Sequence, residues 1–264
     1  PLSSGDDRPQ IDVLFPPVTG GDRLIYDQRV FPDAMFAKFT GTRASPVRVP
    51  SSGRIIDVTA APFNATGDGS TDDTAAIVAA INYVKKVLEA SPGRDNPDTN
   101  FVLYFPGNAA HPKTYLCTDE VTWTGSFAAP GEHCQYWRVV GEDRRYSTIR
   151  LKPNSTGFGA GANKAFLNLA KEALNALETK NTIDNITISI GAGNPGCTAV
   201  RFGGANGDTM GNFTVVFEDG KGKYGLWLQD VSQFWCHDIT FTGGQYAVGG
   251  NGARSTCSAF EHVT

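Results

Sequence analysis

The sequence predicts an all-β protein folded as a parallel β-helix, a solenoid of stacked coils that begins with one capping α-helix. The first observation is a tripeptide of polar residue, apolar residue and threonine that occurs four times, at 185–187, 212–214, 238–240 and 262–264. Its threonines follow one another at intervals of 27, 26 and 24 residues. The second observation is a series of short apolar runs separated by Gly or Pro. A nearly constant period of this length is typical of repeat architectures, in which each repeat covers its neighbour.

The composition fits a chain rich in turns and strands. Of the 264 residues, 40% are hydrophobic, 19% are charged, 30 are Gly and 15 are Pro, which is enough apolar material for a sizeable core. The formal net charge of −4 leaves no broad basic surface, so we expect neither a nucleic acid nor an anionic membrane as partner. No apolar run approaches the roughly 20 residues that a membrane-spanning helix needs.

Two regions are expected along the chain. Residues 1–53 are predicted to form an extended N-terminal arm, because seven prolines are spread among scattered apolar residues there, a composition that suits a segment lying along a folded body. Residues 54–264 are predicted to form the N-terminal part of a β-helix domain, since regular strand and helix patterns begin at Arg54.

The first regular elements are a short strand over 55–58 and a helix that follows the turn-rich run 64–74. Thr71 or Asp72 is placed to cap the first helical turn, and Asp73 favours its positive end. The prolines that follow end the helix. Apolar residues at spacings of three or four form one stripe, which predicts an amphipathic helix: Ile77, Ala80, Ile81, Val84 and Leu88.

The later apolar runs are short and strand-like. The stretch 164–177 fits both a strand and a helix, and we expect a strand followed by a short helical insertion. Between the tripeptides runs a second strand series in which Val200, Leu226 and Ala247 take equivalent places. Two interleaved series with one period indicate coils built from several short strands. The other strands are expected at 101–105, 137–140 and 148–151.

Alternation along each strand places Ile186 and Ile188 inside the solenoid and Thr187 outside. The alternative is a β-sandwich of antiparallel hairpins, because strands at similar spacing also occur in that fold. Hairpins give no reason for residue types to recur at intervals of 24 to 27 residues. The repeat therefore favours the solenoid.

The run Gly67–Ile77 (GDGSTDDTAAI) closely resembles the N-terminal signature of the pectate lyase superfamily. These are right-handed parallel β-helix proteins that include polygalacturonase-like glycoside hydrolases and laminarinase-type β-1,3-glucanases. Residues 102–107 with 114–116 are similar to the next element of that superfamily, here stretched by an insertion that contains His111. Residues 194–200 and 260–264 also resemble its coils. The resemblance implies a right-handed β-helix over 54–264 with the first motif as its capping helix, and that motif carries no catalytic residue.

The β-helix is expected to be incomplete at Thr264. A bare terminal coil exposes unpaired backbone groups and an apolar cross-section. No capping helix or polar tail follows the fourth tripeptide. We therefore expect a C-terminal continuation, or another chain, to stack on the last coil.

Five cysteines indicate disulfides and a secreted, extracellular protein. They show no CxxC pair and no zinc-finger spacing, so we expect no metal site. Cys117 and Cys134 are placed to close a loop, and Cys236 and Cys257 to meet across neighbouring coils. An odd number leaves one further cysteine for a free thiol or for a bond to another chain.

Four Asn-x-Thr sequons also indicate secretion and are predicted glycosylation sites. Asn64 and Asn154 lie in expected turns and are the better sites. Asn185 and Asn212 belong to the repeated tripeptide, so their sequons are partly by-products of the repeat.

Sugar-cleaving enzymes that resemble this chain use carboxylates from adjacent coils, one to protonate the leaving oxygen and one as base or nucleophile. None of the candidates here lies in a recognisable catalytic motif, and each also fits a turn or a ladder of stacked residues. Asn185, Asn212, Asp238 and His262 are expected to form such a polar ladder. His237 and His262 are placed either to transfer protons or to lie solvated at a strand edge. The candidate carboxylates are Glu218, Asp219, Asp230, Asp238 and Glu261.

Trp227, Trp235 and Tyr246, with Tyr224 nearby, are candidate substrate-binding residues, because aromatic faces bind sugar rings. Trp227 lies between two leucines and should point opposite to both. We expect a secreted, polysaccharide-degrading protein of the glycoside hydrolase type that needs no cofactor, a lyase being less favoured. The alternative is a non-catalytic structural or adhesive extracellular protein assembled from stacked β-helices.

Overall fold

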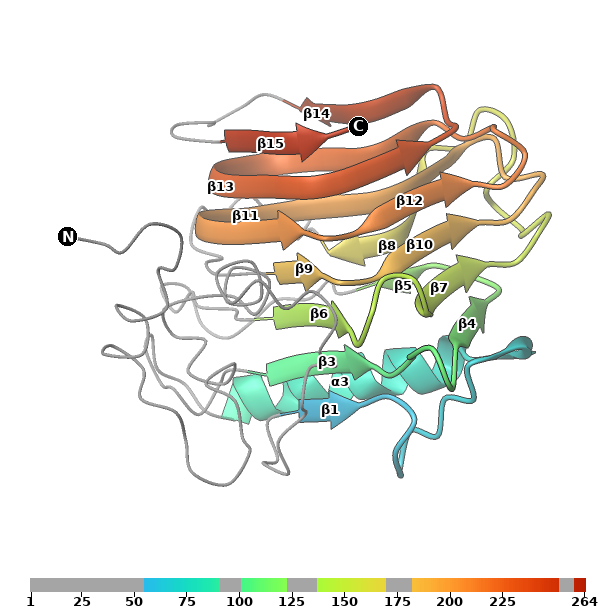
Figure 1. Ribbon diagram of the computed structural model, residues 1–264, viewed down its shortest axis with the longest axis vertical. Helices are drawn as coiled ribbons and strands as arrows, with labels where there is room; N and C mark the ends of the chain where they lie inside the picture. Colours follow the sequence, from blue (N-terminus) through green and yellow to red (C-terminus); the bar gives the residue numbers. More distant parts are fainter. Residues whose placement is uncertain (1–54, 91–100, 123–136, 170–181, 252–258) are drawn as a thin grey trace.

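The computed structural model describes residues 55–90, 101–122, 137–169, 182–251 and 259–264. Within these residues every pair of neighbouring strands is parallel. The strands stack into one solenoid whose coils follow one another along a common axis (Figure 1). The predicted parallel β-helix is confirmed, and the antiparallel β-sandwich is excluded for this part of the chain.

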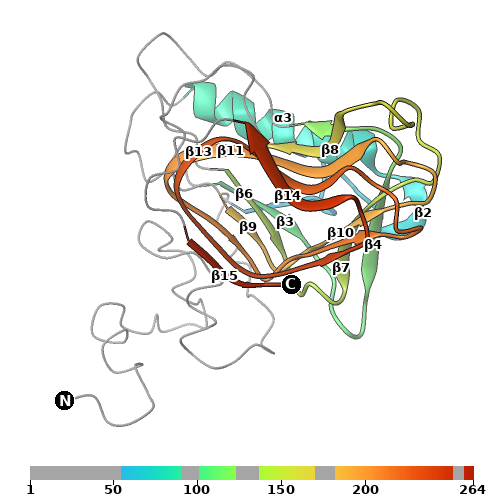
Figure 2. The ribbon, with the colours of Figure 1, turned by 90° about the horizontal axis from the view of Figure 1, so that it is seen from above.

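Each coil has three sides when it is viewed along the axis (Figure 2), and we number them in chain order. Side 1 contains β1 (Ile55–Asp57), β3 (Phe101–Phe105), β6 (Trp137–Gly141), β9 (Thr182–Asp184), the end of β11 (Cys197–Gly211), the middle of β13 (Tyr224–Thr242) and β15 (Ala259–Val263).

Side 2 contains β2 (Asp68–Asp72), β4 (Lys113–Cys117), β7 (Ser147–Leu151), β10 (Thr187–Ile190), β12 (Thr214–Phe217) and the end of β13. Side 3 contains β5 (Val121–Thr122), β8 (Lys164–Leu169), the beginnings of β11 and β13, and β14 (Tyr246–Asn251). β11 and β13 are therefore continuous strands that bend around the edge between side 3 and side 1 (Figure 2).

The helix α3 (Thr74–Ala90) lies beside β1 and β3 at the start of the solenoid (Figure 1). Its predicted apolar stripe is buried, from Ile77 to Val84, which confirms the capping helix. The Asp73 carboxylate accepts hydrogen bonds from the backbone N–H groups of Thr66 (2.6 Å) and Gly67 (3.0 Å). It thereby holds the preceding turn against the first helical turn.

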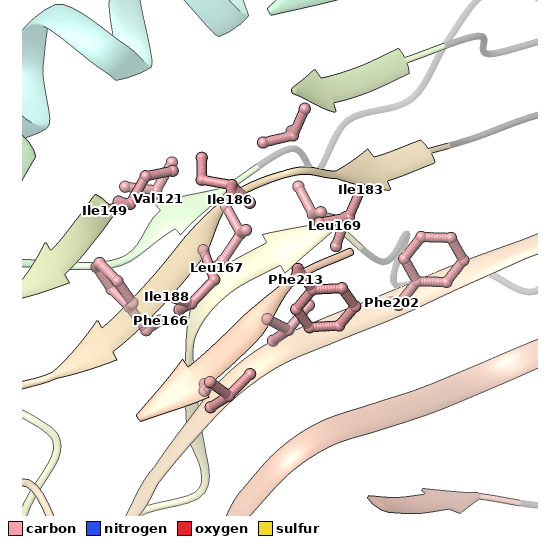
Figure 3. Close-up of a cluster of buried hydrophobic side chains, with 14 of the residues drawn as sticks. Val121, Ile149, Phe166, Leu167, Leu169, Ile183, Ile186, Ile188, Phe202 and Phe213 are labelled. Atoms are coloured by element: carbon pink, nitrogen blue, oxygen red, sulfur yellow. The ribbon is translucent and has the colours of Figure 1, made fainter. Parts of the chain in front are cut away.

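The core consists of apolar side chains that stack from coil to coil (Figure 3). Ile149, Ile188 and Val215 are neighbours in successive coils of side 2, and all three are fully buried. Thr187, between the buried Ile186 and Ile188, is only half-buried. The predicted inward and outward alternation is confirmed.

The repeated tripeptide marks the edge between side 1 and side 2. Asn185, Asn212, Asp238 and His262 adopt a left-handed backbone conformation, with φ of 56°, 48°, 52° and 51°. Asn and Asp tolerate this conformation better than most residues, and one such residue turns the chain sharply. The polar residue therefore forms the corner, the apolar residue points inward and the threonine lies on side 2. The predicted ladder of equivalent positions is confirmed.

The disulfide prediction is wrong for both of its described members. Cys117 and Cys236 have free thiols, as does Cys197. All three side chains are fully buried, because they occupy inward positions among apolar residues, and burial raises the pKa of each thiol well above its usual value. Cys134 and Cys257 lie outside the described residues.

Other expectations fall outside the described residues, namely the arm over 1–53 and the helical insertion after Leu169. The strand before that insertion is present as β8. Among the residues described, no helix is both long and apolar enough to cross a membrane.

Candidate functional site

Three aromatic side chains lie together on the outer surface of side 3. Tyr224 and Trp227 belong to β13, and Tyr246 begins β14 in the next coil. Leu226 and Leu228 pack in the core on either side of Trp227, so Trp227 points outward, as its register predicted. Tyr246 is 48% exposed. We call these three residues the aromatic surface.

The rings of the aromatic surface contact one another. Tyr224 and Tyr246 stack with ring centroids 5.2 Å apart and an interplanar angle of 23°, and Tyr224 meets Trp227 at 4.8 Å and 60°. Gly249 pairs with Trp227 across the coils. A Cβ at Gly249 would lie 2.6 Å from the Tyr224 ring and 3.1 Å from the Trp227 ring, so this glycine leaves the space that the two rings occupy.

Polar side chains border the aromatic surface. Arg201 occupies the place of Trp227 in the preceding coil, and the Lys223 ammonium lies 5.7 Å from the centroid of the Tyr224 ring. Gln229 and Asn251 pair across the coils at the far end of the same strands. Open aromatic faces beside guanidinium, ammonium and amide groups provide both stacking and hydrogen bonds for a polyhydroxylated ligand.

A second group of side chains lies at the edge between side 1 and side 2. One Asp238 oxygen lies 3.1 Å from Nδ1 of His237, and the other lies 3.5 Å from Nδ1 of His262. Glu261 Oε1 lies 3.9 Å from the same His262 nitrogen. We call these four residues the histidine–carboxylate cluster.

The cluster combines a buried and an exposed imidazole. The His237 side chain is fully buried, whereas the side chain of His262 is 65% exposed. The Trp235 ring stacks on His237 with centroids 4.0 Å apart, on side 1. The cluster can transfer protons through His262, with Asp238 orienting the imidazole. It lies at a different edge of the solenoid from the aromatic surface, so the two groups do not form one site.

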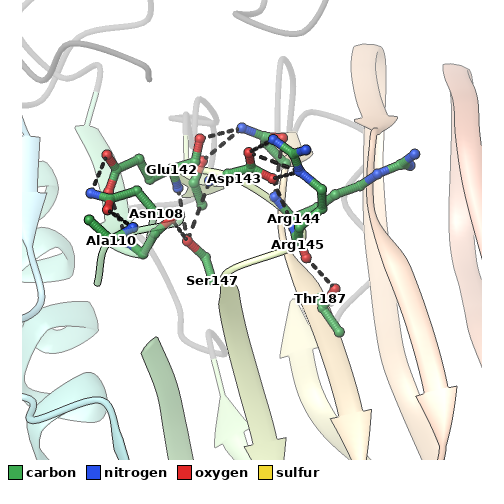
Figure 4. Close-up of polar contacts among 11 residues, drawn as sticks. Asn108, Ala110, Glu142, Asp143, Arg144, Arg145, Ser147 and Thr187 are labelled. Atoms are coloured by element: carbon green, nitrogen blue, oxygen red, sulfur yellow. Dashed lines mark hydrogen bonds and ion pairs between the residues drawn. The ribbon is translucent and has the colours of Figure 1, made fainter. Parts of the chain in front are cut away.

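The chain before β7, drawn in Figure 4, is also bonded to the cluster, which lies three coils away. The Arg144 guanidinium donates to the backbone carbonyl of Asp238 (3.1 Å), and the Thr187 hydroxyl donates to the carbonyl of Arg144 (2.6 Å). Ser147 donates to the carbonyls of Phe105 (3.0 Å) and Gly107 (3.2 Å). These bonds tie the corners of successive coils together. Sequence analysis did not identify Arg144, because its partner lies 94 residues away.

Glu218 and Asp219 follow β12 and have structural partners. The Arg150 guanidinium binds Glu218 through two bonds of 2.6 and 2.7 Å and lowers the pKa of that carboxyl. Asp219 accepts bonds from the backbone N–H groups of Gly193 and Lys221, both at 2.9 Å, and these bonds lower its pKa. Carboxyl groups with lowered pKa values remain ionised near neutral pH and are poor proton donors.

The remaining candidate residues from the sequence are Asp230 and His111. Asp230 lies in β13 directly after Gln229, at the end of side 3, and its side chain lies outside the described part.

Among the described residues, no group of three or more His, Cys, Asp or Glu side chains is arranged to hold a metal ion. His111 lies in the turn where its backbone pairs with Asn108.

The sequence profile of one protein family, described as "Rhamnogalacturonase A/epimerase, pectate lyase-like", matches residues 57–260. The chain belongs to this family. The resemblance to the pectate lyase superfamily is thereby confirmed, and the chain is a carbohydrate-related β-helix protein. No curated protein sequence matches it.

One solved structure shares the architecture of this pectate lyase-like chain. ORF18 of Geobacillus virus E2 superimposes with a TM-score of 0.52 at 16% sequence identity, over 80% of this chain and 42% of that one. The chain thus spans about two fifths of the length of that protein. The mannuronan C-5 epimerase AlgE6 A-module of Azotobacter vinelandii (TM-score 0.31, 15% identity, 75% and 57% coverage) and the Agl-KA catalytic domain (0.32, 12%, 83% and 50%) are more distant.

Proposed function

We propose that this pectate lyase-like chain belongs to an extracellular protein that binds a polysaccharide along side 3 and hydrolyses it. The observation that carries the proposal is the aromatic surface, because its rings lie outside the core and one of them is half exposed. Stacking on aromatic faces is a general means of holding sugar rings. The family's name, which refers to enzymes of polysaccharides, supports the same class of ligand.

Asp230 is the carboxylate that we assign to catalysis in this proposal. It is three residues beyond Trp227 in β13, directly after Gln229. The pairing with β11 shifts between Gln229 and Ser232, so strict alternation along the strand is interrupted at this position. Hydrolysis needs a second carboxyl group within about 5 to 10 Å, and that group would come from a neighbouring coil. Glu218 and Asp219 do not suit the role of the acid, because Arg150 and backbone N–H groups keep them ionised. Their oxygens are also already engaged by these partners.

A non-catalytic structural or adhesive protein is the second candidate function. It is favoured by the location of Asp238 and Glu261, since the structure brings these two carboxylates together at His262 but at a different edge from the aromatic surface. A protein that binds sugar chains without cleaving them needs the aromatic surface and no acid–base pair beside it.

The test separates binding from cleavage. Affinity electrophoresis of the chain in gels containing plant, algal and fungal polysaccharides measures binding, and release of reducing sugar measures hydrolysis. Trp227→Ala and Tyr246→Ala should each weaken retention by about tenfold, or about 1.4 kcal/mol. Tyr83→Ala is the matched control, because Tyr83 is also about half exposed (45%) but lies on α3. Equal retention of all three variants would overturn the proposed binding surface.

Hydrolysis is tested with Asp230→Asn. The proposal expects unchanged retention and loss of reducing-sugar release by a factor of at least about 100. Retention without any release by the unmodified chain would instead favour the structural or adhesive protein. In a purely adhesive protein, Trp227→Ala would weaken polysaccharide retention, whereas Asp230→Asn would change neither retention nor sugar release.

We further propose that β-structure from the same or another chain stacks on the last coil. Phe260 pairs with the buried Cys236 at an inward position, yet it is 50% exposed. Phe260→Glu should remove a contact between chains if a second chain supplies the cover, which light scattering during size-exclusion chromatography would detect as a lower mass.

A further inference from the structure

The outer surface of side 1 carries a second buried apolar cluster. Val102 and Tyr104 of β3 and Val140 of β6 are 5%, 6% and 1% exposed, and Ile55 of β1 packs against them. Leu103, which alternates with Val102 and Tyr104, belongs to the main core. The second cluster therefore lies on the opposite, outward surface of the same strands.

Burial continues along the outer surface of side 1 into the later coils. Thr182, Asp184, Thr209 and His237 alternate with core residues there, and none is more than 5% exposed. On the other two sides, burial of outward residues is not continuous: Thr187 on side 2 and Arg201 on side 3 are only half-buried, although Ser189 and Asn168 are buried. A sheet surface with buried apolar and polar side chains is one that packs against another layer.

The segment that precedes β1 is suited to form this layer. Ile55 is the first residue of β1 and already contacts the second cluster, so the chain before it enters the structure at this surface. The outer surface of side 1 extends over five steps between neighbouring strands from β1 to β13, at about 4.8 Å each. Fewer than about ten extended residues, at about 3.3 Å each, span this distance. Residues 1–53 are long enough to cover the surface several times over.

The composition of this segment fits a layer better than a free tail. Apolar residues occur in short runs, such as Val13–Phe15 and Leu24–Tyr26. Prolines keep such a segment extended and limit the entropy lost when it docks. Acidic and basic residues are both present, which suits a surface where Arg138 and Asp184 are both buried.

We propose that residues 1–53 pack along the outer surface of side 1 as an intramolecular layer over the second apolar cluster. The layer covers side 1 and leaves the outer surfaces of sides 2 and 3 uncovered. Burial of the phenol, which raises the pKa of Tyr104 well above its usual value, agrees with a covered site. The proposal is independent of the sugar-binding function.

Photo-crosslinking in the full chain tests the proposal. Benzoylphenylalanine in place of Tyr104 should crosslink, after irradiation and peptide mass spectrometry, to peptides from 1–53 of the same chain. The same group in place of Tyr246, on side 3, is the matched control and should give no such crosslink. Crosslinks from position 104 to a second molecule, crosslinks to another segment of the chain, or no crosslink at all would overturn the proposal.

Limited trypsin digestion gives a second readout that does not depend on crosslinking. Val140→Asp places a charge under the proposed layer and should increase the cleavage rate within 1–53 by at least about tenfold, because cleavage follows the population of the undocked segment. Val216→Asp, at a half-buried outward position of side 2, is the control and should leave that rate unchanged. Equal rates in the two variants would contradict docking on side 1.

Discussion

Arg150 and Glu218 form a bidentate ion pair that spans the coil between them. The Nε–Oε1 distance is 2.6 Å and the Nη2–Oε2 distance is 2.7 Å. Ser189, in the intervening coil, donates its hydroxyl to the same Oε1 atom at 2.8 Å. Three successive coils of side 2 are thus joined by side chains as well as by their backbone ladder.

Glu218→Gln should lower the free energy of unfolding by about 1 kcal/mol at pH 7, because a bidentate, partly buried pair lies at the upper end of the range for surface ion pairs. Urea unfolding followed by circular dichroism measures the change. Combining the substitution with Arg150→Gln should cost less than the two changes added together, and strict additivity would show that the pair contributes nothing.

The stabilisation by Glu218 should depend on pH in one direction. Arg150 lowers the pKa of this carboxyl in the folded state, so its contribution is complete above the unfolded-state pKa of about 4.3 and is lost as pH falls through the lower folded-state value. The difference in stability between wild type and Glu218→Gln should shrink below about pH 4. A difference that grows on acidification would contradict this account.

Gly211→Ala should destabilise the protein by about 1 to 3 kcal/mol, the usual cost of overpacking. A Cβ at Gly211 would lie 2.2 Å from Nε2 of His237, so the buried imidazole would have to move. Thermal unfolding of Gly159→Ala provides the control, because a Cβ at Gly159 meets nothing within 4 Å. Equal melting temperatures for the two variants would show that His237 does not occupy this place.

Asn212→Gly and Asn212→Ala should differ in stability because of the left-handed corner. Glycine adopts a φ near the observed 48° without strain, whereas alanine pays about 1 to 2 kcal/mol there. The glycine variant should therefore unfold at a higher denaturant concentration than the alanine variant. The reverse order would show that residue 212 does not adopt the left-handed backbone conformation.

Cys117, Cys197 and Cys236 should resist alkylation in the native protein and react after unfolding without any reductant. Their thiols are buried and free, and the raised pKa of each keeps it protonated near neutral pH. Iodoacetamide labelling with peptide mass spectrometry measures this. A requirement for reductant at Cys117 or Cys236 would restore the disulfides that the structure contradicts.

Glycosylation is expected at Asn64 and Asn154 and not at Asn185 when the protein passes through a secretory pathway. The first two side chains are exposed. The Asn185 amide is half-buried and donates to the carbonyl of Glu142 at 2.7 Å. Asn64→Gln and Asn154→Gln should each remove one glycan on a gel, whereas Asn185→Gln should leave the mobility unchanged.

Much of the fold could be predicted because each repeat needs a residue type that tolerates the left-handed backbone conformation at its corner. Asn, Asp and His recur at the left-handed corner, and the threonine two residues later recurs on the same sheet surface. The number of residues in each coil was harder to predict from the strand series of side 3. The series placed Ala247 opposite Leu226, whereas Val248 is the residue that pairs with it, because the turns between β13 and β14 shift the register by one.

The candidate site was less predictable because it depends on neighbours in other coils. The outward direction of Trp227 followed from the two leucines beside it, but its position beside Tyr224 required the space left by Gly249. Asp219 is a carboxylate directly after a strand, as expected of a catalytic candidate, but its hydrogen bonds to nearby backbone N–H groups are those of a turn residue. Sequence patterns do not separate these two roles, because both favour an exposed aspartate after a strand.

The continuity of β13 has a mechanical consequence. This single strand of 19 residues follows three sides of the solenoid and is held by hydrogen bonds to β11 beneath it and to β14 and β15 above it. A pulling force applied to the coil is shared by many bonds loaded in parallel. We expect optical-tweezers traces to show whole coils detaching in discrete steps, with β13 among the last segments to yield.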